Sequence, residues 1–315
     1  MKMPRKIIID TDPGQDDAVA ILLALASPAE LEVAAIIAVA GNVPLALTKI
    51  NACKVLELAD RTDIPVYVGC DRPIKRALVT AEHVHGRTGL DGPDLPAPRM
   101  ALQTQDGVEY LIAALRAAPV GTYTLCPLGP LTNIAAALLK APDIAPRVRE
   151  IVLMGGAYFE VGNITPVAEF NVFVDPEAAE IVLNSNIPIV MLPLDVTHHA
   201  LATPARLAQI RAIGNRAGDA VIAMLNFSER FDLKKYGWDG APLHDPNVVA
   251  YLLDPRLYQG RMVNVCVETT SMLTLGMTVV DYWRVTDRKP NAFYVRDINA
   301  DRFYALLAAR LARLP

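Results

Sequence analysis

Four aspartates lie within one eight-residue turn near the start of the chain, and this turn constrains the fold more than any other feature. It reads Asp10-Thr-Asp-Pro-Gly-Gln-Asp-Asp17 and follows the apolar run Ile7–Ile9. Isoleucines in a row predict a buried strand, Pro13-Gly14 predicts a turn, and Asp16 and Asp17 then open the next helix. The sequence therefore places four carboxylates at the carboxyl end of its first strand.

Carboxylates this close together repel one another, because like charges a few ångströms apart cannot all stay ionised without a counter-ion. A single Asp-Asp pair at a helix start would be explained by the helix dipole, which favours negative charge there. Four in eight residues are better explained by a bound divalent cation that prefers oxygen ligands. The spacing alone does not distinguish calcium from magnesium.

Strands and helices alternate after this turn. Apolar runs predict the strands, and segments with helical spacing separate them. The expected strands are Val33–Val39, Pro65–Val68, Tyr123–Cys126, Ile151–Met154 and Ile189–Leu192, and the expected helices are Ala18–Ala26, Leu45–Asp60, Val108–Ala117, Leu131–Lys140 and Asp175–Leu183. Such alternation is typical of βαβ units, so we expect an α/β fold with an open, largely parallel central sheet and helices on both faces.

The pattern changes after about Thr203. Two helical stretches, Pro204–Ile213 and Ala217–Leu233, precede three segments typical of small β-hairpin elements near the C-terminus, and a closing helix begins at Asp301. The three segments are Val263–Glu268, Thr274–Val280 and Ala292–Val295. Since no internal repeat, low-complexity tract or linker separates the parts, we interpret residues 1–315 as one domain.

Composition and charge narrow the class of protein. The 315 residues are 52% hydrophobic and 20% charged, which is enough apolar material to bury a core without disulfides. A net charge of −4 provides no basic face for nucleic acid, so a small polar substrate fits better. No apolar stretch reaches the ~18 residues of a membrane span. The run Ile7–Ile9 is also shorter than the apolar core of a secretion signal, so we expect a cytoplasmic protein without a membrane partner.

The cysteines give no sign of a metal site or of a disulfide framework. The four of them are far apart and form no CxxC pair: Cys53, Cys70, Cys126 and Cys266. We interpret them as reduced thiols in the core.

Polar groups also follow the other predicted strands, where ligands bind in open parallel sheets. Asn42 follows the second strand, Leu128-Gly129-Pro130 follows a later one, and Met154 and Asp195 close the next two. A second acidic site, His244-Asp245-Pro246, lies late in the chain. A lone histidine is usually a hydrogen-bonded structural residue, but His244 lies beside Asp245 in a Gly- and Pro-rich loop, a setting that also fits a pocket residue.

Two polar loops supply further candidates. Asn163 and the run Glu169-Phe170-Asn171 could form an ordinary polar loop, or could offer donors and acceptors for sugar hydroxyls, with Phe170 as an apolar wall. The segment 71–98 is long for a loop in a compact domain, which is typical of functional or mobile loops. Within it, His83 fits a solvated histidine, whereas His85, followed by Gly86, is the better pocket candidate.

Taken in order, these motifs resemble the inosine-uridine-preferring nucleoside hydrolase family from residue 7 to at least 285. The segments that carry the resemblance are Asp10–Ala18, Ala40–Asn42, Val152–Gly156, Ala168–Asn171, Asp175–Ala179 and Leu243–Pro246. Further segments look most like the pyrimidine-preferring bacterial ribonucleoside hydrolases: Val84–Gly86, Gly89–Gly92, Gly240–Pro246 and Gly276–Tyr282.

The resemblance implies one tightly bound Ca²⁺ and a nucleoside as the partner. Its protein ligands would be Asp12, Asp17, the backbone carbonyl of Leu128, and Asp245. Ribose contacts would come from Asp16, Asn42, Asn163, Glu169, Asn171 and Asp245, with Met154 packed near the sugar. His244 would lie on the side of the leaving base, and His85 and Tyr236 would recognise the base. The family further implies a homo-oligomer, either a dimer or a tetramer, and a role in nucleoside salvage.

The implied chemistry is hydrolysis of the N-glycosidic bond of ribonucleosides, with uridine or cytidine expected and inosine as a further substrate. Asp12 would act as general base on a Ca²⁺-held water, and His244 would protonate or hydrogen-bond the departing base. Two other hypotheses stay open at this point. Asp10-Thr-Asp12 also matches the DxD motif of haloacid-dehalogenase-type Mg²⁺ phosphatases, and the same residues could serve a non-catalytic protein that binds metal and nucleoside.

Overall fold

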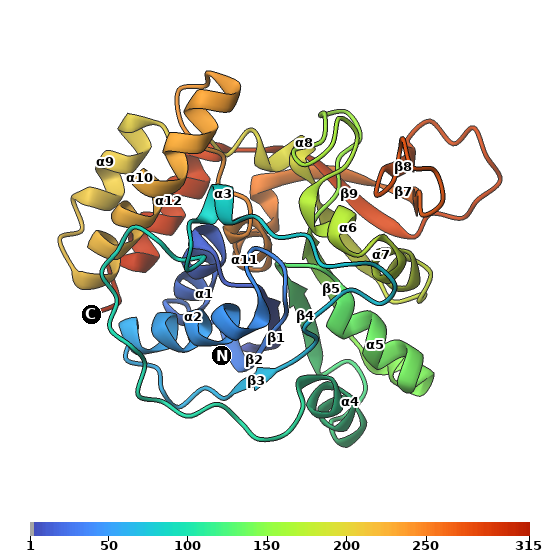
Figure 1. The fold of residues 1–315 in the computed structure, drawn as a ribbon, viewed down its shortest axis with the longest axis horizontal. Coiled ribbons are helices and arrows are strands. Elements are labelled where there is room, and N and C mark those ends of the chain that lie inside the picture. Colours follow the sequence, from blue (N-terminus) through green and yellow to red (C-terminus); the bar gives the residue numbers. More distant parts are fainter. Residues whose placement is uncertain (1–2) are drawn as a thin grey trace.

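A nine-stranded sheet forms the centre of the structure, in the order β3-β2-β1-β4-β5-β6-β9-β7-β8 (Figure 1). The computed structural model describes residues 3–315, apart from the side chains of residues 232–234 and 236. The strands are β1 Arg5–Thr11, β2 Leu31–Ala38, β3 Val66–Val68, β4 Tyr123–Pro127, β5 Glu150–Met154, β6 Ile189–Leu192, β7 Tyr258–Val267, β8 Thr278–Asp281 and β9 Ala292–Ile298. Strands β3, β2, β1, β4, β5, β6 and β9, which are neighbours in this order, are parallel to one another, and this confirms the predicted sheet.

The C-terminal strands differ from the prediction in the pairing of β9 and in the start of β8. Strands β7 and β8 form the expected antiparallel hairpin, but β9 lies inside the main sheet, parallel to β6 and antiparallel to β7. Its buried residues on both faces suit an internal strand and not a separate hairpin. Strand β8 begins only at Thr278, because Gly276 takes a positive φ of 76° that interrupts an extended chain.

Helices cover both faces of the sheet, as predicted. One apolar layer includes α1 Gln15–Leu25, α2 Leu45–Leu58, α9 Pro204–Arg211, α10 Arg216–Tyr236, α11 Pro246–Leu253 and α12 Ala300–Leu311. The other includes α4 Gly107–Ala117, α5 Thr132–Lys140 and α7 Pro176–Leu183. In Figure 1 the first group lies mainly on the left of the sheet and the second on the right.

Several short elements went unpredicted. They are α3 Glu82–His85, α6 Phe170–Val174, α8 Leu194–Thr197 and the 3₁₀ turns Pro142–Arg147 and Pro255–Leu257, together with the longer α11. Helices of four or five residues are too short to show a 3.6-residue period, so apolar spacing does not reveal them. Three of these elements, α3, α6 and α8, either border the candidate site or contact residues that border it.

Helix α1 is the most enclosed helix that the site depends on. Every residue from Ala18 to Leu25 is buried, and the helix packs against α2, α10, α11 and α12 as well as the sheet. An alanine-rich helix with no polar face fits this position, because neighbouring helices approach it from several sides. The enclosure fixes the place of Asp16 and Asp17 in its first turn.

The thiol prediction holds for only two of the four cysteines. Cys53 and Cys126 are buried in the core, but Cys70 and Cys266 are half-buried. Cys70 follows β3 at one edge of the sheet, and Cys266 lies on β7 near the other edge, where packing is incomplete. All four are free.

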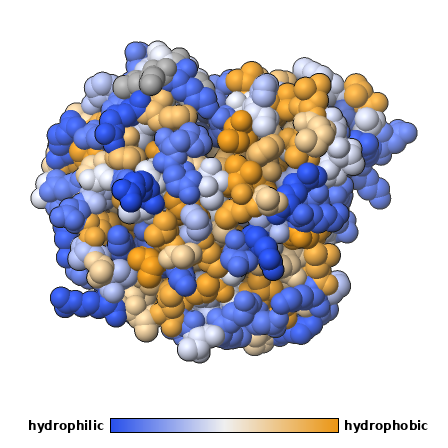
Figure 2. Space-filling model, viewed as in Figure 1, coloured by the Kyte–Doolittle hydropathy of each residue, from blue (hydrophilic) through white to orange (hydrophobic). Residues whose placement is uncertain are grey.

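The surface is mixed in character, with apolar side chains gathered on the half that carries β7 and β8 (Figure 2). Exposed large apolar residues occur in the segments 158–161 and 272–285, among them Phe159 and Trp283. The two segments touch, since the Phe159 and Tyr282 rings lie 5.0 Å apart edge to face. Among the described residues, no helix is both long and apolar enough to cross a membrane.

Truncating Leu22 to alanine should destabilise the protein strongly, because this α1 side chain is fully buried. The expected loss is about 2–5 kcal/mol in the free energy of unfolding, measured by urea denaturation. Leu139→Ala is the matched control, since Leu139 is 58% exposed in helix α5, and it should change stability by less than about 0.5 kcal/mol. Equal losses in the two variants would contradict the enclosure described for α1.

Candidate active site

The acidic turn lies at the point where the strand order of the sheet reverses. From β1 the chain proceeds to β2 and β3 on one side, and then returns to place β4 on the other side of β1. The ends of β1 and β4 are joined directly, because the Leu128 backbone N–H donates to the Asp10 carbonyl at 2.8 Å. A crevice opens at such a reversal, beyond the carboxyl ends of the strands. Asp12 directly follows the end of β1, and Leu128 directly follows the end of β4.

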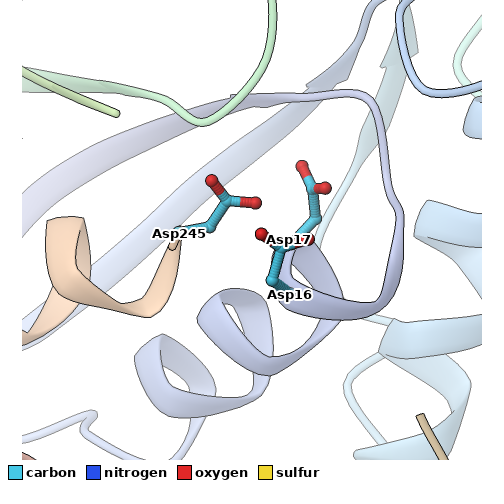
Figure 3. A group of neighbouring side chains, drawn as sticks. All are labelled: Asp16, Asp17 and Asp245. Atoms are coloured by element: carbon cyan, nitrogen blue, oxygen red, sulfur yellow. The ribbon is translucent and has the colours of Figure 1, made fainter. Parts of the chain in front are cut away.

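Three aspartates from two distant segments meet at this crevice (Figure 3). Asp16, Asp17 and Asp245 each offer a carboxylate oxygen, and these oxygens all lie within 4.8 Å of one another. Asp16 and Asp17 open helix α1, whereas Asp245 directly precedes α11. The packing of α1 against α11 brings them together. Sequence reasoning placed all three in one site, but only the fold makes them neighbours.

Asp12 is buried beside this cluster and has one unpaired oxygen. Its Oδ2 accepts from the Asn42 backbone N–H at 2.7 Å, while Oδ1 is buried with no hydrogen-bond partner among the described residues. The Asn42 side-chain amide donates to the Asp12 carbonyl at 3.1 Å and to Asp17 Oδ2 at 3.2 Å. A side chain at Gly41 or Gly129 would overlap the Asp12 carboxylate, so both neighbours must be glycine.

Burial strongly shifts the pKa values of the aspartates in this cluster. It raises the pKa of Asp12 well above its usual value, and the charges of Asp17 and Asp16 raise it further. Burial likewise raises the pKa of Asp17, with a smaller contribution from the charge of Asp16. Burial also raises the pKa of Asp245, with smaller contributions from the charges of Asp16, Asp17 and Asp12. Deeper in the sheet, burial raises the pKa of Asp10 to about 7, against a hydrogen bond from Asn133 that lowers it.

The donor set fits a hard divalent cation. Oxygen atoms alone are offered, at least one of them is buried and unpaired, and the carboxylates oppose one another's ionisation. A cation among them would satisfy the Asp12 Oδ1 atom and neutralise the repulsion. The structure therefore supports a metal site at this edge of the sheet.

A cavity opens beside the acidic cluster and gathers most of the residues singled out from the sequence. Those that line it are Asp16, Asn42, His85, Leu128, Met154, Asn163, Glu169, Phe170, Asn171, His244 and Asp245. Asp12 and Asp17 are not part of its wall; both are buried, at 1% and 0% exposure, and adjoin the cavity through Asp16 and Asp245. The side chain of Tyr236 lies outside the described residues.

The polar residues on one wall already hold backbone groups in place. Glu169 caps helix α6 by accepting from the Asn171 backbone at 2.8 Å, and it also accepts from the Gly156 backbone at 2.9 Å. Asn171 donates its side-chain amide to the Leu128 carbonyl at 2.7 Å. The run predicted as a polar loop is thus partly helical. Burial raises the pKa of Glu169, against the backbone hydrogen bonds that lower it.

Two histidines occupy the cavity with their Nδ1 atoms engaged. His244 Nδ1 lies 2.8 Å from the Thr197 hydroxyl, and His85 Nδ1 lies 2.7 Å from Gln15 Oε1. Burial lowers the pKa of His244 to about 3, with smaller contributions from His198 and His85. Burial lowers the pKa of His85 as well. Both rings are therefore neutral at pH 7 in this structure.

Sequence reasoning missed one wall of the cavity. His83, interpreted as a solvated residue, also lines it and meets the Phe231 ring edge-on at 5.5 Å. Leu225, Ser228 and Phe231 complete this wall from α10. Their three-residue spacing places them on one helix face, which was the available signal. Lys235, further along α10, donates to the Asn163 carbonyl at 2.6 Å and joins this helix to the opposite wall.

Comparison with known proteins identifies the class. The model of the inosine-uridine preferring nucleoside hydrolase family matches residues 7–305, and this chain belongs to that family. It is 53% identical over 310 residues to an uncharacterised protein of Schizosaccharomyces pombe, covering 98% of this chain and 100% of that one. It is 48% identical over 314 residues to the pyrimidine-specific ribonucleoside hydrolase RihA of Enterobacter sp. strain 638, covering 99% of each.

A solved structure agrees with these relatives. The purine-preferring ribonucleoside hydrolase from Gardnerella vaginalis superposes with a TM-score of 0.91 at 31% identity, covering 98% of each chain. The protein is accordingly a nucleoside hydrolase, an N-glycosidase acting on ribonucleosides. The phosphatase and non-catalytic hypotheses are not favoured, since the family match accounts for the Asp-Thr-Asp motif together with the rest of the chain.

A bound divalent cation should raise the thermal stability of the protein more at pH 8 than at pH 5. In the metal-free protein, the folded-state pKa values of Asp10, Asp12, Asp17 and Asp245 lie above the value of about 3.9 for an unfolded aspartate. Their contribution to stability is therefore full below about pH 4 and is lost as the pH rises through the raised values, about 7 for Asp10. A cation bound among Asp12, Asp17 and Asp245 would replace their protons and offset their part of that loss.

The measurement is thermal unfolding at pH 5 and pH 8, each with CaCl₂ or with EDTA. Calcium at 100 times its Kd at pH 8 should add about 2.7 kcal/mol to the free energy of unfolding there, and the same calcium concentration should add less at pH 5. A calcium effect that is absent, or equal at the two pH values, would contradict the placement of a cation among protonated aspartates.

Proposed function

We propose that this nucleoside hydrolase prefers pyrimidine ribonucleosides, uridine and cytidine, with inosine as a further substrate, and that its cation is Ca²⁺. The observation that carries the proposal is the cluster of buried aspartates beside a cavity lined by polar residues. The relatives named pyrimidine-specific are 46–48% identical to this chain, whereas the purine-preferring structure is 31% identical. The closer likeness favours pyrimidines.

Four groups would hold the cation: the carboxylates of Asp12, Asp17 and Asp245, and the backbone carbonyl of Leu128. The unpaired Oδ1 of Asp12 supports its place in this set. The Leu128 carbonyl now accepts from Asn171, and a carbonyl oxygen has two lone pairs, so it can serve both. When bound, the cation would lower the pKa of a neighbouring water and hold the ribose hydroxyls.

Asp12 would act as the general base. Its carboxylate is held by the Asn42 backbone N–H at 2.7 Å, and burial raises its pKa. A base of this kind accepts a proton more readily as the water attacks C1′. Cleavage of the C–N bond leaves positive charge on the ribose, which the carboxylates of the site stabilise.

Ribose recognition would fall to Asp16, Asn42, Asn163, Glu169 and Asn171, with Met154 against the sugar and Phe170 as an apolar wall. All seven line the cavity. Asn42, Glu169 and Asn171 are tied to backbone groups by the hydrogen bonds described above, and the Asn163 side chain accepts from the Phe170 backbone at 2.9 Å, so the wall is formed before the substrate arrives. Such preorganisation lowers the cost of orienting the nucleoside.

His244 would assist the leaving base as a neutral donor, because its lowered pKa keeps the ring uncharged at pH 7. With Nδ1 next to the Thr197 hydroxyl, Nε2 is left for the cavity. His85 and Tyr236 would contact the base. The family resemblance also supports a homo-oligomer, a dimer or a tetramer, which a sizing measurement would determine.

Uridine, cytidine and inosine should each be tested for release of free base in the presence of calcium or EDTA. We expect base release that is fastest with a pyrimidine nucleoside and lost on complete removal of metal. Asp12→Ala should lower kcat by at least about 10²-fold, since it removes the general base. Absence of base release from all three nucleosides would refute the proposal, and base release unaffected by EDTA would refute its metal.

His244→Ala should lower kcat more with inosine than with uridine. Purines depart most readily when the imidazole side of the base receives a hydrogen bond or proton, whereas the pyrimidine ring lacks that nitrogen. The measurement is kcat for both nucleosides in wild type and variant. An equal loss on the two would rule out the role assigned to His244.

A further inference from the structure

The short helix α8 and the residue after it, Asp195 to His198, contact the candidate site without lining it. This segment follows strand β6, and none of its four residues belongs to the cavity wall. Its polar side chains nevertheless contact two segments that line the cavity. One of these is the loop between β5 and α6, and the other is the segment around His244.

Asp195 holds the first segment by its backbone. Oδ1 accepts from the backbone N–H groups of Phe159 at 2.6 Å and Glu160 at 3.3 Å, and Oδ2 accepts from Tyr158 at 3.1 Å. The Tyr294 hydroxyl donates to Oδ2 at 2.8 Å. The carboxylate is 3% exposed, so these four bonds satisfy a buried charge. Asp195 thereby fixes three successive residues of the loop.

The two aromatic side chains held at this anchor do not lie in the core. Tyr158 and Phe159 are 37% and 42% exposed. A few residues further on, the same loop presents Asn163 to the cavity, where the Asn163 side chain accepts from the Phe170 backbone at 2.9 Å. A second tie runs from α8 to the loop, since His198 Nδ1 lies 3.1 Å from Glu160 Oε2.

Thr197 holds the second segment. Its hydroxyl is fully buried and lies 2.8 Å from Nδ1 of His244. A hydroxyl that donates to Nδ1 places the ring proton on Nε2, the atom that remains for a ligand in the cavity. The contact fixes the orientation of the ring, and with the hydroxyl as donor it also fixes the tautomer.

We propose that Asp195–His198 is a positioning element of the nucleoside site. Asp195 sets the loop that presents Asn163 to the ribose, and Thr197 sets the His244 ring toward the base. One short helix therefore couples the sugar side of the pocket to the base side. The proposal rests on the proposed function for the roles of Asn163 and His244.

Asp195→Asn tests the loop. The amide replaces an accepting oxygen with a donor, so at least one backbone N–H of residues 158–160 loses its partner. KM for uridine should rise about tenfold, the size expected for one lost hydrogen bond to a charged group, with a smaller change in kcat. Tyr294→Phe is the matched control: it removes one bond to the same carboxylate but leaves all three amide bonds, and should keep KM within about twofold of wild type.

A double-mutant cycle separates positioning from general destabilisation. If Asp195 acts through Asn163, Asp195→Asn should add little to the KM of an Asn163→Ala enzyme. Amide hydrogen exchange of residues 157–163 should also be faster in Asp195→Asn than in wild type, and this readout does not require activity. Additive effects on KM, or unchanged exchange in this loop, would overturn the role of Asp195.

Thr197→Val tests the histidine with a side chain of the same shape. Without the hydroxyl, kcat for inosine should fall about tenfold with KM unchanged, and Thr197→Ser should restore it. The ¹⁵N chemical shifts of the His244 ring should show the Nε2-protonated tautomer in wild type and a mixture in Thr197→Val. Wild-type protein without hydrolase activity would refute the proposed function, whereas unchanged ring shifts in Thr197→Val would refute this inference alone.

Discussion

Repulsion among buried aspartates is the constraint on which the rest of the site depends. Asp12, Asp17 and Asp245 lie where burial opposes ionisation, and each raises the cost of charging the others. A chain does not retain such an arrangement for stability, because protonation or unfolding relieves it. The enclosure of α1 keeps Asp16 and Asp17 from moving apart, so a cation is the way to relieve the repulsion while the carboxylates stay ionised.

The topology of the sheet explains how a cation site and the contacts for a whole nucleoside can lie in one crevice. Reversal of strand order at β1 and β4 opens a crevice, and the segments after β1, β2, β4, β5 and β6 each bring a group to it or support one that does. In the proposed site, metal ligands would come from the centre, ribose contacts from the β5–α6 loop and from the segments after β1 and β2, and base contacts from α3, α10 and the segment around His244. Helix α8 ties two of these regions together. Residues far apart in the chain therefore act at one place.

Much of this was predictable from residue type and spacing, and the failures have physical causes. The apolar runs identified six of the nine strands within about two residues, because parallel strands are buried on both faces. Four aspartates in one turn predicted the metal site. The helices α6 and α8 escaped because they are too short to show a period, and their starts depend on tertiary contacts. The pairing of β9 with β6 could not be read from β9 alone. Likewise, the unpaired Asp12 oxygen and the role of Asp195 emerge only once the segments fold together.

A crystal structure of the calcium-loaded protein with a bound uridine analogue that resists hydrolysis is the most direct test of this site. We expect a cation within about 2.3–2.6 Å of oxygens from Asp12, Asp17, Asp245 and the Leu128 carbonyl. The ribose should lie against that cation, with C1′ toward Asp12 and the base toward His244. A cation bound elsewhere, or an analogue seated in another cavity while the aspartates stay protonated, would contradict it.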